Sequence, residues 1–227
     1  MEELLYQHSP KRVLIITAVE RERDSVIHGI DRGRSGSGCE FTIISGGVGP
    51  VAASASTMKA IMEHGHFDII INMGIAGGFG VQNGSVVFAD RIIFADLGVE
   101  DKQGFVPMPT LGFGKNTLKT ASYWHDLIVA RLSKLDVVIH EGTVLTVSTV
   151  TGTEESANKL KSLYPLAIAE EMEGFGVAFA ADLMGIPMLG IRSISNQVGP
   201  RDRDSWEIDL AMSCLTVVGQ SIAEVMR

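Results

Sequence analysis

The side chains best suited to chemistry are carboxylates that directly follow apolar runs. Glu171 and Glu173 flank Met172 shortly after the run LAIA, with Glu170 between the run and Glu171. Two carboxylates at such a junction are costly to bury unless they have partners. One of them could accept hydrogen bonds from a pair of vicinal hydroxyls, as on a ribose. Alternatively, both are charges at a helix start that meet the positive end of the helix dipole.

Glu22 and Asn196 stand at comparable positions. Glu22 lies in AVERER, one helical turn past the first apolar run, and Asn196 ends the apolar run in RSISNQVGPRDRDSW. Glu22 is interpreted either as a general base or as part of a solvated helix face. Asn196 either reaches a site or serves as a turn or helix N-cap residue. The four charges from Arg201 to Asp204 either brace the chain through ion pairs or meet an anionic ligand.

Two glycine-rich stretches, GGVG at 46–49 and GIAGG at 74–78, also follow apolar runs. Glycine there can supply the positive φ of a tight turn, or it can let the backbone approach a ligand closely. In the second case, backbone N–H groups join the carboxylates and the asparagine in the chemistry of the site.

The elements that must position these residues alternate between apolar runs and helical patterns. Predicted strands lie in 12–18, 39–45, 67–73, 84–96 (one strand or two), 141–150, 166–172 and 187–195. Predicted helices cover 20–30, 51–65, 117–135, 153–164, 173–185 and 205–226. Residues 97–116 hold four glycines and two prolines without periodicity. They are predicted to form a long loop that shapes or covers a site.

Strands that are apolar on both faces and alternate with helices indicate a mainly parallel sheet covered on both sides, an α/β fold. Ligands of such sheets bind at the carboxyl ends of the strands. The candidate carboxylates, the asparagine and both glycine stretches all fall there. A length of 227 residues favours a single domain over 1–227.

Composition excludes several classes of protein. A formal charge of −8 argues against a nucleic-acid partner, although one arginine suffices for a small anion. Cys39 and Cys214 form no CxxC pair and are expected to be reduced thiols. MEELLYQHSP lacks the features of a signal peptide, and no apolar run approaches the ~18 residues of a membrane span. We therefore expect a soluble, cytoplasmic protein with no membrane partner.

Familiar cofactor and hydrolase motifs are absent. The sequence contains no GxGxxG, GxxxxGK[ST], HExxH or GxSxG, and its six histidines do not cluster at ligand spacings. A dinucleotide enzyme, a P-loop NTPase, a zinc hydrolase and a serine hydrolase therefore lack their usual support. We expect no metal and no cofactor.

Five stretches together carry a family resemblance. In this order, AVERERDSV, SGGVGPVAA, INMGIAGG, AEEMEGFGVA and RSISN resemble the nucleoside phosphorylase/nucleosidase superfamily, with methylthioadenosine/adenosylhomocysteine nucleosidases as the general template. The resemblance covers nearly the whole chain and rests on the ordered set, because each motif alone is weak. It implies a three-layer α/β/α domain with a mixed, mainly parallel central sheet. Within the superfamily, RSISNQVGPRDRDSW is similar to the signature of the futalosine hydrolase family.

The resemblance also implies roles for matching residues. Glu22 matches the glutamate that activates the attacking water, and Glu173 matches the one that grips the ribose 2′- and 3′-hydroxyls. Met172 matches the methionine that packs on the ribose. The other residues implied to line the substrate site are Ala76, Gly77, Val150, Thr151 and Glu171.

Position 196 departs from the adenine-type nucleosidases, which have an aspartate there. Adenine carries a 6-amino donor and hypoxanthine a 6-carbonyl acceptor, whereas an asparagine amide presents one donor group and one acceptor. Its NH₂ can donate to O6 while its carbonyl accepts the proton that N7 carries as the base leaves. An unpaired acceptor costs ~1–3 kcal/mol. Asn196 therefore predicts a preference for 6-oxopurine nucleosides by roughly one to two powers of ten.

The implied reaction is hydrolysis of the N-glycosidic bond of futalosine, which releases hypoxanthine and dehypoxanthine futalosine in menaquinone biosynthesis. Phosphorolysis is disfavoured because neither glycine stretch carries Arg or Lys. One alternative is a methylthioadenosine/adenosylhomocysteine or other purine nucleosidase. The other is a nucleoside-binding protein without activity, against which the retained Glu22 and Glu173 argue.

Futalosine also carries an aryl carboxylate, which should meet a cation. Arg201 and Arg203 are candidates, and structural ion pairs are the alternative role for both. The 97–116 segment, with Phe105, Pro107 and Phe113, is expected to wall the aromatic tail. In similar nucleosidases a partner subunit contributes to this region, so the resemblance implies a homodimer or a higher homo-oligomer.

Overall fold

The computed structural model describes residues 12–34, 38–102, 104–120 and 123–226. The first eleven residues lie outside the described residues, and the prediction that they form no signal peptide concerns that segment. The single domain over 1–227 also stays a prediction. The strands are β1 (Arg12–Thr17), β2 (Glu40–Ser45), β3 (Ile69–Gly78), β4 (Val86–Phe94), β5 (Gly98–Asp101), β6 (Gly104–Pro107), β7 (Thr117–Lys119), β8 (Ile139–Thr146), β9 (Ala167–Glu171) and β10 (Met188–Gln197). The helices are α1 (Glu20–Gly33), α2 (Pro50–His64), α3 (Tyr123–Leu132), α4 (Glu154–Leu163), α5 (Gly174–Met184), α6 (Ile208–Val225) and two short 3₁₀ helices, η1 (Met108–Leu111) and η2 (Arg203–Ser205).

Eight strands form one mixed sheet in the order β10-β4-β8-β9-β3-β1-β2, with β7 paired to β4. The pairs β1–β2, β1–β3, β3–β10, β4–β8 and β8–β9 are parallel. The pairs β4–β10, β3–β9 and β4–β7 are antiparallel. Because β10 pairs with β3 as well as with β4, part of the sheet closes on itself. The predicted mixed, mainly parallel sheet is confirmed, and the closure brings the ends of β3, β9 and β10 together.

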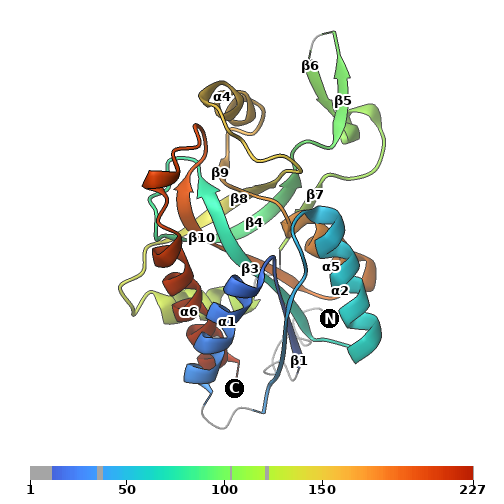
Figure 1. Cartoon of the computed structure of the whole chain (residues 1–227). Coiled ribbons are helices and arrows are strands. Elements are labelled where there is room, and N and C mark those ends of the chain that lie inside the picture. Colours follow the sequence, from blue (N-terminus) through green and yellow to red (C-terminus); the bar gives the residue numbers. More distant parts are fainter. Residues whose placement is uncertain (1–11, 35–37, 103, 121–122, 227) are drawn as a thin grey trace.

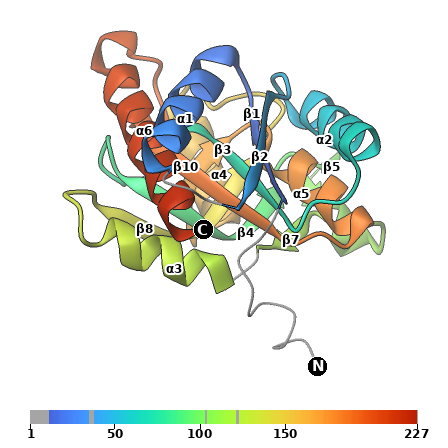
Figure 2. The same cartoon turned by 90° about the horizontal axis from the view of Figure 1, so that it is seen from below.

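Helices cover both faces of the sheet, with α1, α3 and α6 on one side and α2 and α5 on the other (Figures 1 and 2). Along β3, Ile69 and Ile71 join the apolar cluster beneath α1 and α6, whereas Ile70 joins the cluster beneath α2 and α5. This is the pattern of a strand that is buried on both faces. The predicted helical layers are therefore confirmed.

Two sequence predictions are wrong between residues 97 and 135. The segment 97–116 is not a structureless loop, because β5 and β6 pair as an antiparallel hairpin that projects from the body and η1 follows it (Figure 1). The helix predicted over 117–135 begins only at Tyr123, since Thr117–Lys119 pair with the edge of β4. Pairing with a free strand edge overrides local helix propensity here.

The last helix has the length and hydropathy of a membrane span. The segment Arg203–Val225 meets both criteria, but half of its most apolar stretch is buried inside the protein. Leu215, Val218 and Ile222 of α6 are fully buried in the cluster shared with β3. Packing into the core thus accounts for the apolar composition of α6.

Candidate active site

Glu22 lies where β1 gives way to α1 and is only 3% exposed. Its Oε2 accepts hydrogen bonds from the backbone N–H groups of Ala18 (2.9 Å) and Val19 (3.2 Å). Its Oε1 accepts a third from the N–H of Ile75 in β3 (2.8 Å). The interpretation as a solvated helix face is therefore wrong. A carboxylate offers about four acceptor positions, so one is left to take a proton from water.

The two glycine stretches need glycine for different structural reasons. Gly47 and Gly49 have φ of 87° and 92°, so GGVG is a turn that needs glycine for its backbone. GIAGG instead lies within β3, where Gly74 and Gly77 are not in the positive-φ region. A Cβ at Gly74 would lie 2.8 Å from Oε1 of Glu22. Glycine at 74 thus makes room for the carboxylate.

Glu173 stands directly before α5 and is 9% exposed. Its Oε1 accepts a hydrogen bond from the backbone N–H of Gly49 (2.9 Å), which joins the end of β9 to the GGVG turn. Burial, together with the charges of Glu171 and Glu22, raises the pKa of Glu173 from 4.5 to about 7, although Gly49 and Arg192 act in the opposite direction. Glu22 therefore lies within electrostatic reach, and Glu173 keeps acceptor positions free for two hydroxyls.

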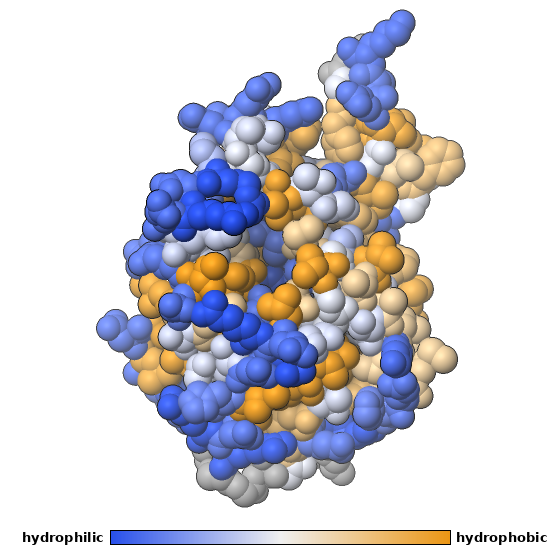
Figure 3. All heavy atoms as spheres, in the orientation of Figure 1, coloured by the Kyte–Doolittle hydropathy of each residue, from blue (hydrophilic) through white to orange (hydrophobic). Residues whose placement is uncertain are grey.

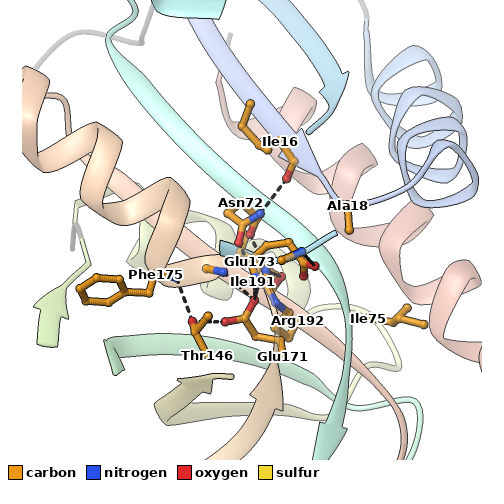
Figure 4. A network of polar contacts seen from close by, with 12 residues as sticks. Ile16, Ala18, Asn72, Ile75, Thr146, Glu171, Glu173, Phe175, Ile191 and Arg192 are labelled. Carbon is orange, nitrogen blue, oxygen red and sulfur yellow. Dashed lines mark hydrogen bonds and ion pairs between the residues drawn. The ribbon is translucent and has the colours of Figure 1, made fainter. Parts of the chain in front are cut away.

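Glu171 and Arg192 form a buried ion pair next to Glu173, with side chains 1% and 3% exposed (Figure 4). Arg192 Nη2 lies 2.8 Å from Oε2 of Glu171 and also donates to Oδ1 of Asn72. Glu171 further accepts from the Thr146 hydroxyl and from the backbone N–H of Glu173 (2.7 Å). These contacts favour a positioning role for Glu171, whose predicted contact with substrate stays a prediction.

Arg192 is a site residue that the sequence analysis missed. Its Nε is buried and has no hydrogen-bond partner among the described residues. Such a donor is costly unless a bound oxygen satisfies it. The available signal was a charged residue inside an otherwise apolar strand, since a buried arginine needs a partner.

Asn196 is the penultimate residue of β10 and lies beside Gly77 of β3, just after a bulge in the register that follows Ile194. Its Oδ1 accepts from the Ser195 hydroxyl (2.8 Å), and its Nδ2 donates to the carbonyl of Gln197 (2.9 Å). The amide still has one donor hydrogen and one acceptor lone pair uncommitted. A 6-oxopurine would require this donor for its O6 and this acceptor for its protonated N7.

A cavity of about 90 Å³ lies at this end of the sheet, and Asn196, Gly77, Val150 and Thr151 all line it. With Arg201, which also lines the cavity, five of the predicted residues are thus brought together near the carboxyl ends of β3, β9 and β10. The wall also includes Glu170 and the segment 197–201.

Arg201 closes this cavity together with Trp206, and its guanidinium lies 5.1 Å from the centre of the indole ring. The ion pairs predicted for Arg201 with neighbouring aspartates are not found among the described residues. Asp202 instead accepts from the backbone N–H of Asp204 at the start of η2 (3.3 Å). The charge of Arg201 is therefore available to an anion.

Other predicted residues lie outside the wall of this cavity. Ala76 is buried in the core cluster beneath α2 and α5, and Met172 is partly buried between the two glutamates. Phe105 lines a separate cavity of about 390 Å³ that shares Val150 and Thr151 with the first. Phe113 is 67% exposed.

Metal and thiol chemistry find little support in the part of the chain that the structure describes. No group of three or more His, Cys, Asp or Glu there could hold a metal ion. Both cysteines are free, as predicted. Burial raises the pKa of Cys39 to about 11, so it is a poor nucleophile.

Comparisons with known proteins cover nearly the whole chain. The family model described as the phosphorylase superfamily matches residues 14–227. The chain is 40% identical to the futalosine hydrolase of Streptomyces coelicolor, over 95% of this chain and 96% of that protein. It is 38% identical to the futalosine hydrolase of Acidothermus cellulolyticus, over 88% and 85%.

A solved structure shares the fold. The 5′-methylthioadenosine/S-adenosylhomocysteine nucleosidase from Neisseria meningitidis, in complex with methylthio-immucillin-A, matches with a TM-score of 0.79. The match covers 95% of this chain and 98% of that one, at 19% identity.

Proposed function

The chain belongs to the futalosine hydrolase family of the phosphorylase superfamily, and we propose that it hydrolyses the N-glycosidic bond of futalosine. The products are hypoxanthine and dehypoxanthine futalosine, a step of menaquinone biosynthesis. The chain is thus an N-glycosyl hydrolase. The observation that carries the choice of substrate is the 40% identity over 95% of its length.

The ribose half of the site supports this reaction. Glycosidic bonds break through an oxocarbenium-like sugar, which anionic surroundings stabilise. In the proposed mechanism Glu173 accepts hydrogen bonds from the ribose hydroxyls, and Glu22 takes the proton of the water that adds to C1′. The burial of both carboxylates supports these roles, because solvent screens their charges little.

The base half supports departure of a 6-oxopurine. A proton from solvent neutralises the leaving base at N7, and Asn196 would donate to O6 and accept a hydrogen bond from the resulting N7–H. Its two uncommitted hydrogen-bonding positions favour this role. Gly77, Val150 and Thr151 would lie against the ring, since they line the same cavity.

Water is favoured over phosphate as the nucleophile. A phosphate site needs cations, and neither GGVG nor GIAGG carries one. Arg192 lies close by, but its Nη1 and Nη2 donors are taken by Glu171, Asn72 and Ile191, and only its buried Nε–H lacks a partner among the described residues. The same region therefore suits a neutral water beside the carboxylate of Glu22.

The proposal also covers how the aryl carboxylate of futalosine is bound and whether the chain forms a homo-oligomer. Arg201 would meet the carboxylate, and Phe105 would wall the aromatic tail. An apolar cavity of about 560 Å³ between α2 and α5, together with Val51 at 82% exposure, supports a homo-oligomer that covers this side. In Figure 3, the polar tip of the β5–β6 hairpin gives way to apolar surface at its base. A cytoplasmic location stays an expectation.

One incubation series tests the proposal. Futalosine, inosine and methylthioadenosine are supplied separately, with and without phosphate, and free base is measured by chromatography. Hypoxanthine released from futalosine without phosphate is the expected result. Faster adenine release from methylthioadenosine would instead support the nucleosidase alternative. A requirement for phosphate, or hypoxanthine binding without turnover, would contradict hydrolysis.

A further inference from the structure

Glu170 is a buried carboxylate of the base cavity that the mechanism above leaves unused. It is 5% exposed and lines the same cavity as Asn196 and Gly77. Its Oε1 accepts from the backbone N–H of Thr151 (2.8 Å), and its Oε2 accepts from the Thr151 hydroxyl (2.5 Å). Each oxygen therefore keeps acceptor capacity for a further donor.

The register of three strands sets Glu170 opposite Asn196. Gly77 of β3 pairs with Glu170 of β9 on one side and with Asn196 of β10 on the other. Residues directly opposite in a sheet project to the same face. Two strand spacings, about 10 Å, separate the flanking backbones. Side chains from both flanking strands thus line one cavity of about 90 Å³, at which Val198 lies over Gly77.

The edge of the purine ring offers different partners to the amide of Asn196 and to the carboxylate of Glu170. Going round a 6-oxopurine, N7 and O6 are followed by N1, which carries a hydrogen and is a donor. In a 6-aminopurine, N1 is instead an acceptor. A carboxylate opposite N1 therefore pairs with the first base, whereas the second base places acceptor against acceptor.

We propose that Glu170 accepts the N1–H of the 6-oxopurine and acts with Asn196 as a second determinant of base specificity. This inference rests on the proposed function and adds a residue to it. Asn196 on β10 forms hydrogen bonds with O6 and N7, and Glu170 on β9 forms one with N1. Thr151 holds the carboxylate in place through its two hydrogen bonds.

The electrostatic surroundings of Glu170 agree with a ligand donor. Burial and the charges of Asp96 and Glu171 raise its pKa, and the two bonds from Thr151 lower it. Thr151 is thus the residue whose hydrogen bonds offset the cost of burying the carboxylate. A further N–H bond from the base would favour its charged form.

Glu170→Gln tests the inference through a ratio of substrates. The values of kcat/KM are measured for futalosine and for its 6-aminopurine analogue, with wild type and variant. We expect the variant to lose about 10- to 100-fold with futalosine and far less with the analogue, because glutamine can donate to an acceptor at N1. The matched control is Thr151→Val, which removes one bond to Glu170 but keeps the carboxylate. It should lower the preference for futalosine by less than Glu170→Gln does, because the acceptor and the bond from the Thr151 backbone N–H remain.

Calorimetric binding of free hypoxanthine and adenine gives a second readout that needs no turnover, and thermal unfolding verifies that the variant folds. An unchanged preference between the two bases would overturn the inference and leave Glu170 as a holder of the Thr151 loop. A wild-type enzyme that releases no hypoxanthine from futalosine would overturn the proposed function itself, and the inference with it.

Discussion

The ribose side and the base side of the site are built in different ways. On the ribose side, Glu22 and Glu171 accept from backbone N–H groups, and Arg192 is buried between strands. On the base side, Asn196 stands at a strand end, and Arg201 lies in an exposed turn. The carboxylates proposed to act on the ribose are thus held within the core. The residues proposed to set specificity lie where a single side chain can change.

The largest expected effect comes from the ribose side. Glu22→Gln should lower kcat/KM for futalosine by about 10²–10⁴-fold, because an amide cannot take the proton of the attacking water. Steady-state kinetics measure it. Glu20→Gln is the control, since that side chain is 79% exposed, and it should stay within about twofold of wild type. A Glu22→Gln enzyme within tenfold of wild type would remove Glu22 from the role of base.

The buried ion pair should dominate stability in the same region. Arg192→Met should lower the free energy of unfolding by ~3–5 kcal/mol, because it leaves the charge of Glu171 buried and unpaired. Urea denaturation measures this, and adding Glu171→Gln should recover part of the loss. The exposed pair of Arg21 and Asp209 is the control, and Arg21→Met should cost under ~1 kcal/mol. Equal losses in the two variants would contradict the difference between buried and exposed pairs.

A change on the base side should alter substrate choice more than stability. In Asn196→Asp the amide donor is replaced by an acceptor-only carboxylate. The ratio of kcat/KM for futalosine over its 6-aminopurine analogue should then fall by about 10- to 100-fold. Competition assays followed by mass spectrometry measure the ratio. A uniform loss with both substrates would mean that Asn196 does not distinguish the 6-substituent.

Glu173 should show a smaller effect that depends on pH. With a pKa near 7 in the folded state against about 4.5 unfolded, the folded chain holds a proton that the unfolded chain has released between these values. Stability should therefore fall as pH rises from 4.5 to 7, and the full cost applies above 7. Glu173→Gln should thus be more stable than wild type by ~1–3 kcal/mol at pH 8 and nearly equal at pH 4.5. Urea titrations at both values measure this, and equal differences would contradict the assignment.

The layers of the fold and the ends of its strands could be predicted from the sequence, because apolar runs and helical periods encode them directly. Closure of the sheet through β3 and β10 could not, since it depends on how long strands curve and pair. The hairpin β5–β6 escaped prediction because glycines and prolines also mark irregular loops.

The site divides in the same way. Glu22, Glu173 and Asn196 could be proposed from the sequence because polar residues at strand ends stand out against apolar runs. Arg192 and Glu170 were missed because their partners, Glu171 and Thr151, are set by packing and register. The predicted ion pairs of Arg201 were wrong because sequence neighbours in a turn need not face one another. The stacked position of Arg201 on Trp206 depends on how η2 folds back.

The most direct test is a competition in water labelled with ¹⁸O, without phosphate. Wild-type enzyme receives equal amounts of futalosine and its 6-aminopurine analogue, and mass spectrometry follows both bases and the released sugar. We predict that hypoxanthine appears about 10- to 100-fold faster than adenine, with ¹⁸O at C1′ of the sugar. Equal release of the two bases, or no cleavage until phosphate is added, would contradict it.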